Sequence, residues 1–258
     1  LCGVITAKLL HSQGWVMGTE PSALQAIVGG GLCLALGLAC GLVNGILVAA
    51  LKVHPFIITL GTMWVFRGIA FVVSKGLSIT FPEGLTGIFK ASLGLEKGLY
   101  AVPVLLMVVV VIFGSILFGR TVFGRRAYAI GGNSEAARYA GLPISRTLVG
   151  IYGLNGLLAG LAAFAGCSFY GAASSADATG YELFVIASAV VGGASLLGGK
   201  GTAFGAMLGT ILIVLIRQSI RILHFDQNYE SILIGIAVVA AVVLDQASQG
   251  WRRRRVAQ

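Results

Sequence analysis

The length of its charge-free segments most constrains what this chain can fold into. Charged residues are absent from three stretches of 31, 22 and 30 residues, namely 21–51, 98–119 and 147–176. Each stretch exceeds the roughly 20 apolar residues that a helix needs to cross the hydrocarbon core of a bilayer. The whole chain is 57% hydrophobic and 10% charged, whereas an ordinary soluble domain carries about 25% charged residues. The sequence therefore predicts an all-α, polytopic transmembrane helix bundle.

Apolar runs separated by charged breaks predict seven spans within a single domain, residues 1–258. An apolar segment that ends near Lys8 precedes these spans, and we expect the chain to begin inside a longer protein. The fifth span is 16 residues long and rich in Gly and Ala, so it is either a full span or a re-entrant or broken helix. The seven predicted ranges are 23–51, 54–74, 101–118, 148–170, 183–198, 203–221 and 230–247.

Arginines in two polar segments set the predicted orientation. Loop 119–147 carries five arginines and one acidic residue, and the tail 248–258 carries four consecutive arginines. Short segments rich in Lys and Arg stay on the cytoplasmic side of a membrane. We therefore predict that this loop and the C-terminus are both cytoplasmic, with Lys52 on the inner side and residues 75–100 on the outer side.

Two cations do not follow this pattern, because Arg217 and Arg221 fall on the predicted outer side. Asp226 and Glu230 are expected to neutralise them. The net charge of +9 does not indicate nucleic acid as a partner, since the basic residues occupy short segments between apolar runs without interleaved aromatic residues. The partner that they indicate is the lipid membrane.

Residue patterns that carry catalysis are not found in the sequence. The three histidines are isolated, and neither HExxH nor GxSxG occurs. Segment 198–202, Gly-Gly-Lys-Gly-Thr, has Ala194 where a phosphate-binding loop needs Gly, and Gly201 where it needs Ser or Thr. The nine acidic residues all lie in loops or near span ends, which argues against a proton relay. We predict no catalytic, cofactor-binding or metal-binding residues, and an energy source on another protein.

Small residues recur at helical spacing, which indicates close packing of helices within the subunit or a dimer. The four cysteines lack CxxC spacing and lie mostly in apolar runs, so they are also interpreted as packing residues. The recurrent glycines are Gly37, Gly41 and Gly45, then Gly156 and Gly160, then Gly201, Gly205 and Gly209.

Three polar residues interrupt the predicted spans. Arg67 lies thirteen residues into the second span, where a central charge costs roughly 2.5–3.5 kcal/mol, so it should face protein or water. Asn44 and Asn155 interrupt otherwise apolar helices. All three are candidates for lining a translocation path, and the alternative is that they fix helix packing by hydrogen bonding.

The polar loop also contains a predicted short helix. Asn133 or Ser134 can cap its N-terminus, Glu135 suits its first turn, Gly141 can end it and Pro143 prevents its continuation. A helix of about two turns is marginal alone in water. Its position between two spans therefore indicates a docking segment, and the alternative is an ordinary surface turn.

The loop contains the sequence Arg125-Arg-Ala-Tyr-Ala-Ile-Gly-Gly-Asn133, followed by Glu135-Ala-Ala-Arg and Gly141. This sequence resembles the cytoplasmic loop of permeases in ribose-type sugar ABC importers. Such permeases are about one and a half spans longer at the N-terminus and carry there an Asp-Leu-Ser type motif that this sequence lacks. The resemblance extends to Asn44-Gly45, to 55–63 with Arg67-Gly68, to 180–183, to 190–193 and to 198–201.

The resemblance implies a permease subunit of the bacterial inner membrane that translocates a ribose-like monosaccharide. Its implied partners are a cytoplasmic ATP-binding subunit, a periplasmic sugar-binding protein and a second permease subunit, identical or not. The short helix would be the coupling helix that docks on the ATPase, with three side chains large enough to enter a cleft and alanines, including Ala140, that allow close approach. The implied coupling residues are Asn133, Glu135, Ala136, Ala137, Arg138, Tyr139 and Gly141.

The sequence leaves other functions open. A branched-chain amino-acid permease shares the general organisation, although not the Tyr-Ala-Ile-Gly-Gly-Asn wording of the loop. A passive channel would need rings of charge or a filter sequence, and an intramembrane enzyme would need polar catalytic pairs on adjacent spans. The sequence does not identify the sugar.

Overall fold

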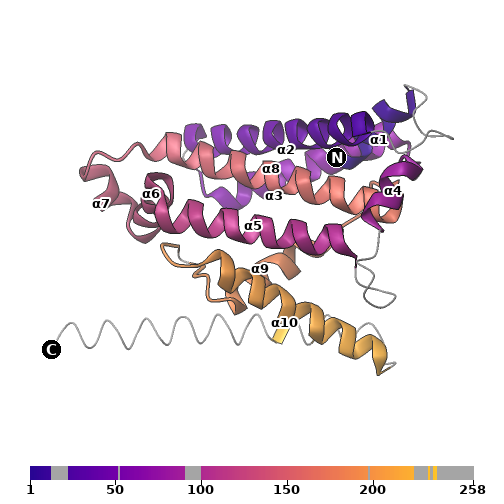
Figure 1. The fold of residues 1–258 in the computed structure, drawn as a ribbon. Helices are drawn as coiled ribbons and strands as arrows, with labels where there is room; N and C mark the ends of the chain where they lie inside the picture. The colour runs from indigo at the N-terminus through magenta and orange to yellow at the C-terminus, as the bar shows by residue number, and fades with distance from the viewer. Residues whose placement is uncertain are drawn as a thin grey trace. The chain divides into compact units, whose positions relative to one another are not determined.

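The computed structural model describes residues 1–12, 23–51, 53–90, 100–196 and 198–223, with the isolated residues 232, 235 and 236. The described part is mostly helical (Figure 1) and forms two compact units. The first unit comprises Leu1–Val108 and Pro143–Asp177, and the second comprises Val109–Leu142 and Ala178–Gln258. The predicted span 230–247 and the tail 248–258 lie outside the residues for which a fold is described.

Two long helices that lie side by side are the centre of the first unit. They are α2 (Ala23–Leu51) and α8 (Ile144–Tyr170), and Figure 1 shows them along one another. A Cβ atom added to Gly37 would lie 2.9 Å from the Cα of Gly160, and one added to Gly156 would lie 2.7 Å from the Cα of Gly41. Glycine therefore lets the two backbones touch, as the spacing of these residues predicted.

Shorter elements pack around one end of this pair. They are α1 (Cys2–Ser12), α3 (Pro55–Ser74) and α4 (Glu83–Phe89). The side chain of Phe164 is central here, because the rings of Phe81 and Phe89 meet it edge to face at centroid distances of 6.2 and 5.7 Å. Two short strands, β1 (Ile79–Thr80) and β2 (Ala172–Ala173), pair antiparallel after α3 and α8.

The second unit contains the end of α5 (Ala101–Arg120), then α6 (Val122–Gly132), α7 (Ser134–Tyr139), α9 (Tyr181–Val191) and α10 (Ala203–Ile222). Helices α9 and α10 pack closely, because a Cβ atom added to Gly192 would lie 2.9 Å from the Cα of Ala206. Ala187 and Ile213 are the buried apolar residues of this contact.

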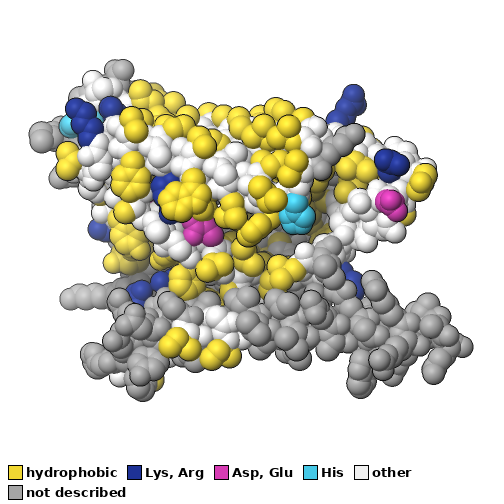
Figure 2. All heavy atoms as spheres, turned by 180° about the vertical axis from the view of Figure 1, so that it is seen from behind, with side chains coloured by type: hydrophobic (Ala, Val, Ile, Leu, Met, Phe, Trp, Pro, Cys, Tyr) yellow, Lys and Arg dark blue, Asp and Glu magenta, His cyan; other side chains and the backbone are white. Residues whose placement is uncertain are grey.

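Five helices of the described residues are long and apolar enough to cross a membrane, namely α2, α3, α5, α8 and α10. They confirm five of the predicted spans. Side chains on α3 and α5 are largely exposed, including Trp64, Val72 and Leu105. Figure 2 shows hydrophobic side chains gathered across one face of the molecule, with few charged ones among them. Such surfaces suit lipid or another apolar partner, as expected for spans.

Of the two alternatives left open for 183–198, a full span or a re-entrant or broken helix, the structure has the interrupted form, because α9 ends at Val191 after 11 residues. At 1.5 Å per residue it is about 16 Å long, whereas the hydrocarbon core is about 30 Å thick. Gly193, Gly198 and Gly199 adopt positive φ angles of 90°, 92° and 74°. These are left-handed conformations that glycine adopts at little cost, so the chain turns there instead of continuing as a helix.

Aromatic rings accommodate Arg217, one of the two cations predicted to lie on the outer side. Its guanidinium carbon lies 4.5 Å from the ring centroid of Phe184 and 5.1 Å from that of Tyr181. Cation–π contacts of this kind stabilise a charge that is partly removed from water. The acidic residues expected to neutralise it, Asp226 and Glu230, lie outside the described residues.

Candidate functional site

The polar loop between α5 and α8 folds into two consecutive helices, of which the sequence predicted only the second. The first is α6, and the Thr121 side chain caps its N-terminus by accepting a 3.2 Å hydrogen bond from the Gly124 amide. Arg125 and Arg126 are exposed on this helix, whereas Ile130 is buried. Helix α6 is thus amphipathic, with its basic residues on the exposed side.

Asn133 joins the two helices. It has an extended backbone, with φ −157° and ψ 101°, and it is both the last cap of α6 and the first cap of α7. Its side-chain Oδ1 accepts a 3.0 Å hydrogen bond from the Ala136 amide. A side-chain cap of this kind satisfies an amide that has no partner within the helix. One residue therefore changes the chain direction and also begins α7.

Backbone hydrogen bonds close the other end of α7. The Gly141 amide donates to the Arg138 carbonyl, and the Leu142 amide donates to the Ala137 carbonyl, both at 3.0 Å. Gly141 has a φ of +73°. This pair of bonds with a left-handed glycine is a Schellman motif, which satisfies carbonyls at a helix end. The predicted short helix is therefore present, and both of its ends are defined by the residues that the sequence indicated.

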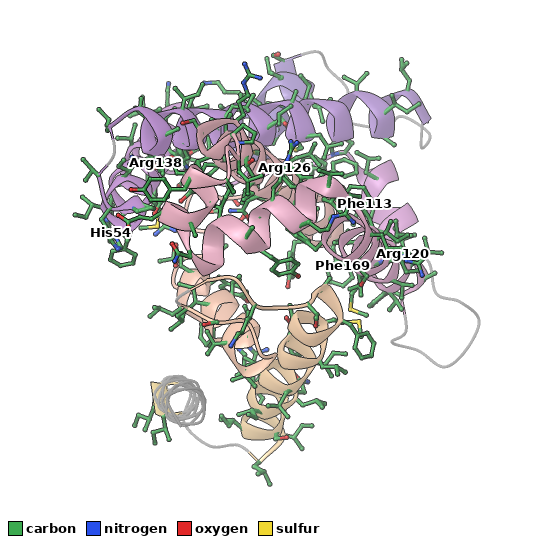
Figure 3. All side chains as sticks on the ribbon, turned by 90° about the vertical axis from the view of Figure 1, so that its left-hand side faces the viewer. His54, Phe113, Arg120, Arg126, Arg138 and Phe169 are labelled. Atoms are coloured by element: carbon green, nitrogen blue, oxygen red, sulfur yellow. The ribbon has the colours of Figure 1, made fainter. Side chains whose placement is uncertain are left out.

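Helix α7 presents most of its side chains to the surroundings. Glu135, Ala136, Arg138 and Tyr139 are exposed, and Tyr139 retains 82% of its accessible surface. The Arg138 guanidinium lies 5.8 Å from the centroid of the Tyr139 ring, and Figure 3 labels Arg138 together with Arg126. A large exposed tyrosine beside an arginine is typical of residues that bind a partner protein.

Ala137 differs from its neighbours because it is buried within the chain. Its methyl group packs against the chain's own residues and is not presented on the exposed side. Glu135 lies in the first turn of α7 and Arg138 in the last turn, so both charges oppose the helix dipole favourably.

The three candidate path residues all lie in the first unit, on three different helices. Asn44 on α2 is half-buried, and its Oδ1 atom is buried without a hydrogen-bond partner in the described structure. Arg67 on α3 is half-buried. Asn155 on α8 is exposed, next to the glycine face that packs on α2. The structure therefore distributes these residues over α2, α3 and α8.

A contact that the sequence did not predict lies beside α7. The C-terminal end of α6 packs on the loop between α9 and α10, and the Tyr128 hydroxyl donates a 2.5 Å hydrogen bond to the Gly201 carbonyl. The sequence feature that could have indicated this contact is the pair of glycines at 131–132 and the pair at 198–199. Their pairing across 67 or more residues could not be read from the chain alone.

Among the residues that the structure describes, three or more His, Cys, Asp or Glu side chains do not gather where they could hold a metal ion. Long apolar helices with a short capped helix between two of them define a multi-pass membrane protein.

Comparison with known proteins assigns the family. The chain belongs to the permease family described as "Branched-chain amino acid transport system / permease component", whose match covers residues 1–242. The chain is thus the membrane-spanning transport component of an ATP-binding-cassette importer and not its catalytic subunit. No solved structure matches it.

Named relatives are similar over nearly the whole chain. The D-allose transport system permease protein AlsC of Escherichia coli K12 is 37% identical over 248 residues, which is 95% of this chain and 72% of the relative. The ribose import permease protein RbsC of the same strain is 33% identical, over 91% of this chain and 72% of the relative. RbsC of Bacillus subtilis strain 168 is 36% identical, over 94% of this chain and 78% of the relative.

Proposed function

We propose that this permease moves a monosaccharide, of the kind that ribose and allose represent, into the bacterial cell across the inner membrane. The observation that carries the proposal is the 33–37% identity, over more than nine-tenths of the chain, to relatives named for allose and ribose transport. The family description names branched-chain amino acids. That description is shared by the whole family, whereas the printed names of these relatives specify sugars.

The proposed partners follow from the family to which the chain belongs and from the geometry of the polar loop. A cytoplasmic ATP-binding subunit would supply the energy, a periplasmic sugar-binding protein would deliver the substrate, and a second permease subunit, identical or not, would complete the path. Helix α7 would dock on the ATP-binding subunit. Its exposed Glu135, Arg138 and Tyr139 are the side chains that can enter a cleft there.

The remaining residues of α7 would shape this contact. The exposed Ala136 and Ala140 have small side chains, so they allow a partner to approach the helix closely. Asn133 and Gly141 hold the two ends through the cap and the left-handed turn. Ala137 contributes by anchoring α7 to its own chain, since it is buried.

The transport path would use polar side chains from the first unit. A sugar carries several hydroxyl groups, each of which needs a hydrogen-bond partner when it leaves water. Asn44, Arg67 and Asn155 offer such partners within otherwise apolar helices. The buried, unpaired Oδ1 of Asn44 supports this role, because an acceptor of this kind costs free energy until a donor reaches it.

The proposed topology puts loop 119–147 and the tail 248–258 on the cytoplasmic side. Both segments are rich in arginine, as cytoplasmic segments of membrane proteins are. One permease domain over 1–258 is supported by a family match that runs through both compact units.

Crosslinking tests the docking of α7. Single cysteines at positions 135, 138 and 139 in the assembled importer should crosslink to the ATP-binding subunit, and Ala136→Glu should lower sugar uptake while ATP hydrolysis continues. Uptake of labelled ribose and labelled leucine by the same cells tests the substrate class. Failure of all three cysteines to crosslink, with normal uptake in the Ala136→Glu variant, would refute the docking role. Uptake of leucine without uptake of a sugar would refute the substrate class.

A further inference from the structure

The end of α6 and the loop between α9 and α10 meet backbone to backbone. A Cβ atom added to Gly131 would lie 2.6 Å from the amide nitrogen of Gly199, and one added to Gly198 would lie 2.6 Å from the carbonyl oxygen of Gly131. Real Cβ atoms essentially never approach other atoms this closely. We call the contact of Gly131, Gly198 and Gly199 the glycine joint.

Tyr128, about one turn before Gly131 on α6, makes a further contact between α6 and the α9–α10 loop. Its hydroxyl donates to the Gly201 carbonyl at 2.5 Å, and its ring meets Phe118 edge to face at 6.2 Å. The hydrogen bond thus connects residues 73 positions apart in the sequence. This polar contact lies beside the backbone contact of the glycine joint. Together the two contacts restrict both the sliding of α6 along the α9–α10 loop and its separation from that loop.

The loop that receives α6 is closed by an internal hydrogen bond and ends in the cap of α10. The Ser195 amide donates to the Lys200 carbonyl at 3.1 Å, and the Thr202 side chain caps α10 by accepting a 3.0 Å hydrogen bond from the Gly205 amide. Gly192, which ends α9, packs against the backbone of Gly205 near the start of α10. A displacement of this loop therefore displaces both helices.

A continuous connection runs from the docking helix to α9 and α10. Helix α7 is joined to α6 by the single residue Asn133, whose backbone and side chain both take part in helix caps. The C-terminal end of α6 then meets the loop at the glycine joint. Close-packed contacts of this kind transmit movement because they cannot compress.

We propose that the glycine joint and Tyr128 are positioning elements that make α6, α7, α9 and α10 move as one body when the ATP-binding subunit displaces α7. The proposal rests on the docking role given to α7 above. It assigns to Gly198–Gly201 a mechanical function, although this segment resembles an incomplete phosphate-binding loop. A movement of α7 would then reach α9 and α10 through α6.

A distance measurement tests whether α6 and α10 move together. Spin labels at Ala129→Cys on α6 and Gln218→Cys on α10, both exposed positions, would be placed in the assembled importer after the four native cysteines are replaced by alanine. The label-to-label distance should stay the same without nucleotide and with Mg-ATP. A distance that shifts with nucleotide beyond the width of its distribution would overturn the proposal. This readout does not depend on α7 touching the ATP-binding subunit at a particular residue.

Sugar uptake by matched variants tests whether the glycine joint and Tyr128 couple ATP hydrolysis to transport. Tyr128→Phe removes one hydrogen bond and keeps the ring, and Gly131→Ala inserts a methyl group into the joint. Sugar uptake per ATP hydrolysed should fall by about two- to tenfold in Tyr128→Phe, and further in Gly131→Ala. Gly132→Ala is the control, because a Cβ atom there meets nothing within 4 Å, and it should behave like the parent protein.

The outcomes separate this proposal from the proposed function. Normal coupling in Tyr128→Phe, with α7 still crosslinked to the ATP-binding subunit, would reject the joint and leave the docking role intact. Loss of coupling in Gly132→Ala equal to that in Gly131→Ala would also reject it, since the steric effect would then not be specific. Reduced uptake per ATP in Tyr128→Phe, with unchanged amounts of assembled importer, would support it.

Discussion

At the scale of single residues, the turns at the ends of α6 and α7 are made by side chains with well-defined roles. Thr121 and Asn133 accept hydrogen bonds from helix amides, and Gly141 takes the left-handed conformation that closes α7. Replacing a cap of this kind by alanine typically costs about 0.5–2 kcal/mol. These residues therefore determine where α6 and α7 begin and end, whatever partner the surface binds.

Asn44 is the residue for which transport and packing roles predict different results. If its buried Oδ1 serves the sugar, Asn44→Ala should raise the KM for sugar uptake and leave thermal stability in detergent unchanged. If the amide serves helix packing, stability should fall by about 0.6–2 kcal/mol with KM unchanged. Asn155→Ala is compared with Asn44→Ala in the same two measurements, because Asn155 is a candidate path residue that is exposed on α8. A variant at position 44 with parental KM would remove Asn44 from the path.

At the scale of elements, the contact of α2 with α8 depends on glycine. Gly156→Ala would place a Cβ atom 2.7 Å from the Cα of Gly41, and backbone cannot move aside as a flexible side chain can. We expect a loss of about 1–3 kcal/mol in stability, measured as a lower melting temperature of the purified permease. Gly166→Ala lies on the same helix, where a Cβ atom meets nothing within 4 Å, and should melt like the parent. Equal melting temperatures for both variants would contradict this account.

At the scale of the whole molecule, topology is the property that the arginine pattern predicts. With the native cysteines removed, a membrane-impermeant thiol reagent added outside intact cells should not label Tyr139→Cys in loop 119–147. It should label Ala176→Cys, an exposed position between α8 and α9 on the predicted outer side. Permeabilised cells should be labelled at both positions. External labelling of position 139 would reverse the predicted orientation.

The sequence predicted the long helices well because membrane insertion depends on local composition. A run of about 20 apolar residues is a span wherever it occurs, so five predicted ranges agree with α2, α3, α5, α8 and α10 to within a few residues. The ends of α7 were also predictable, since a cap and a left-handed glycine act over three or four residues. Helix α6 was missed because it is only 11 residues long and its glycines and arginines are typical of a loop.

Long-range contacts could not be predicted in this way. The early end of α9, the packing of Arg217 on two aromatic rings, and the burial of Ala137 among exposed neighbours all depend on residues distant in sequence. The glycines of 131–132 and 198–199 were visible as motifs, but a single sequence does not state which glycine meets which. The apolar pattern thus determined the spans and the class of protein. Only the tertiary structure decided that α6 and the α9–α10 loop share a joint, because backbone-to-backbone packing leaves no periodic signature in the chain.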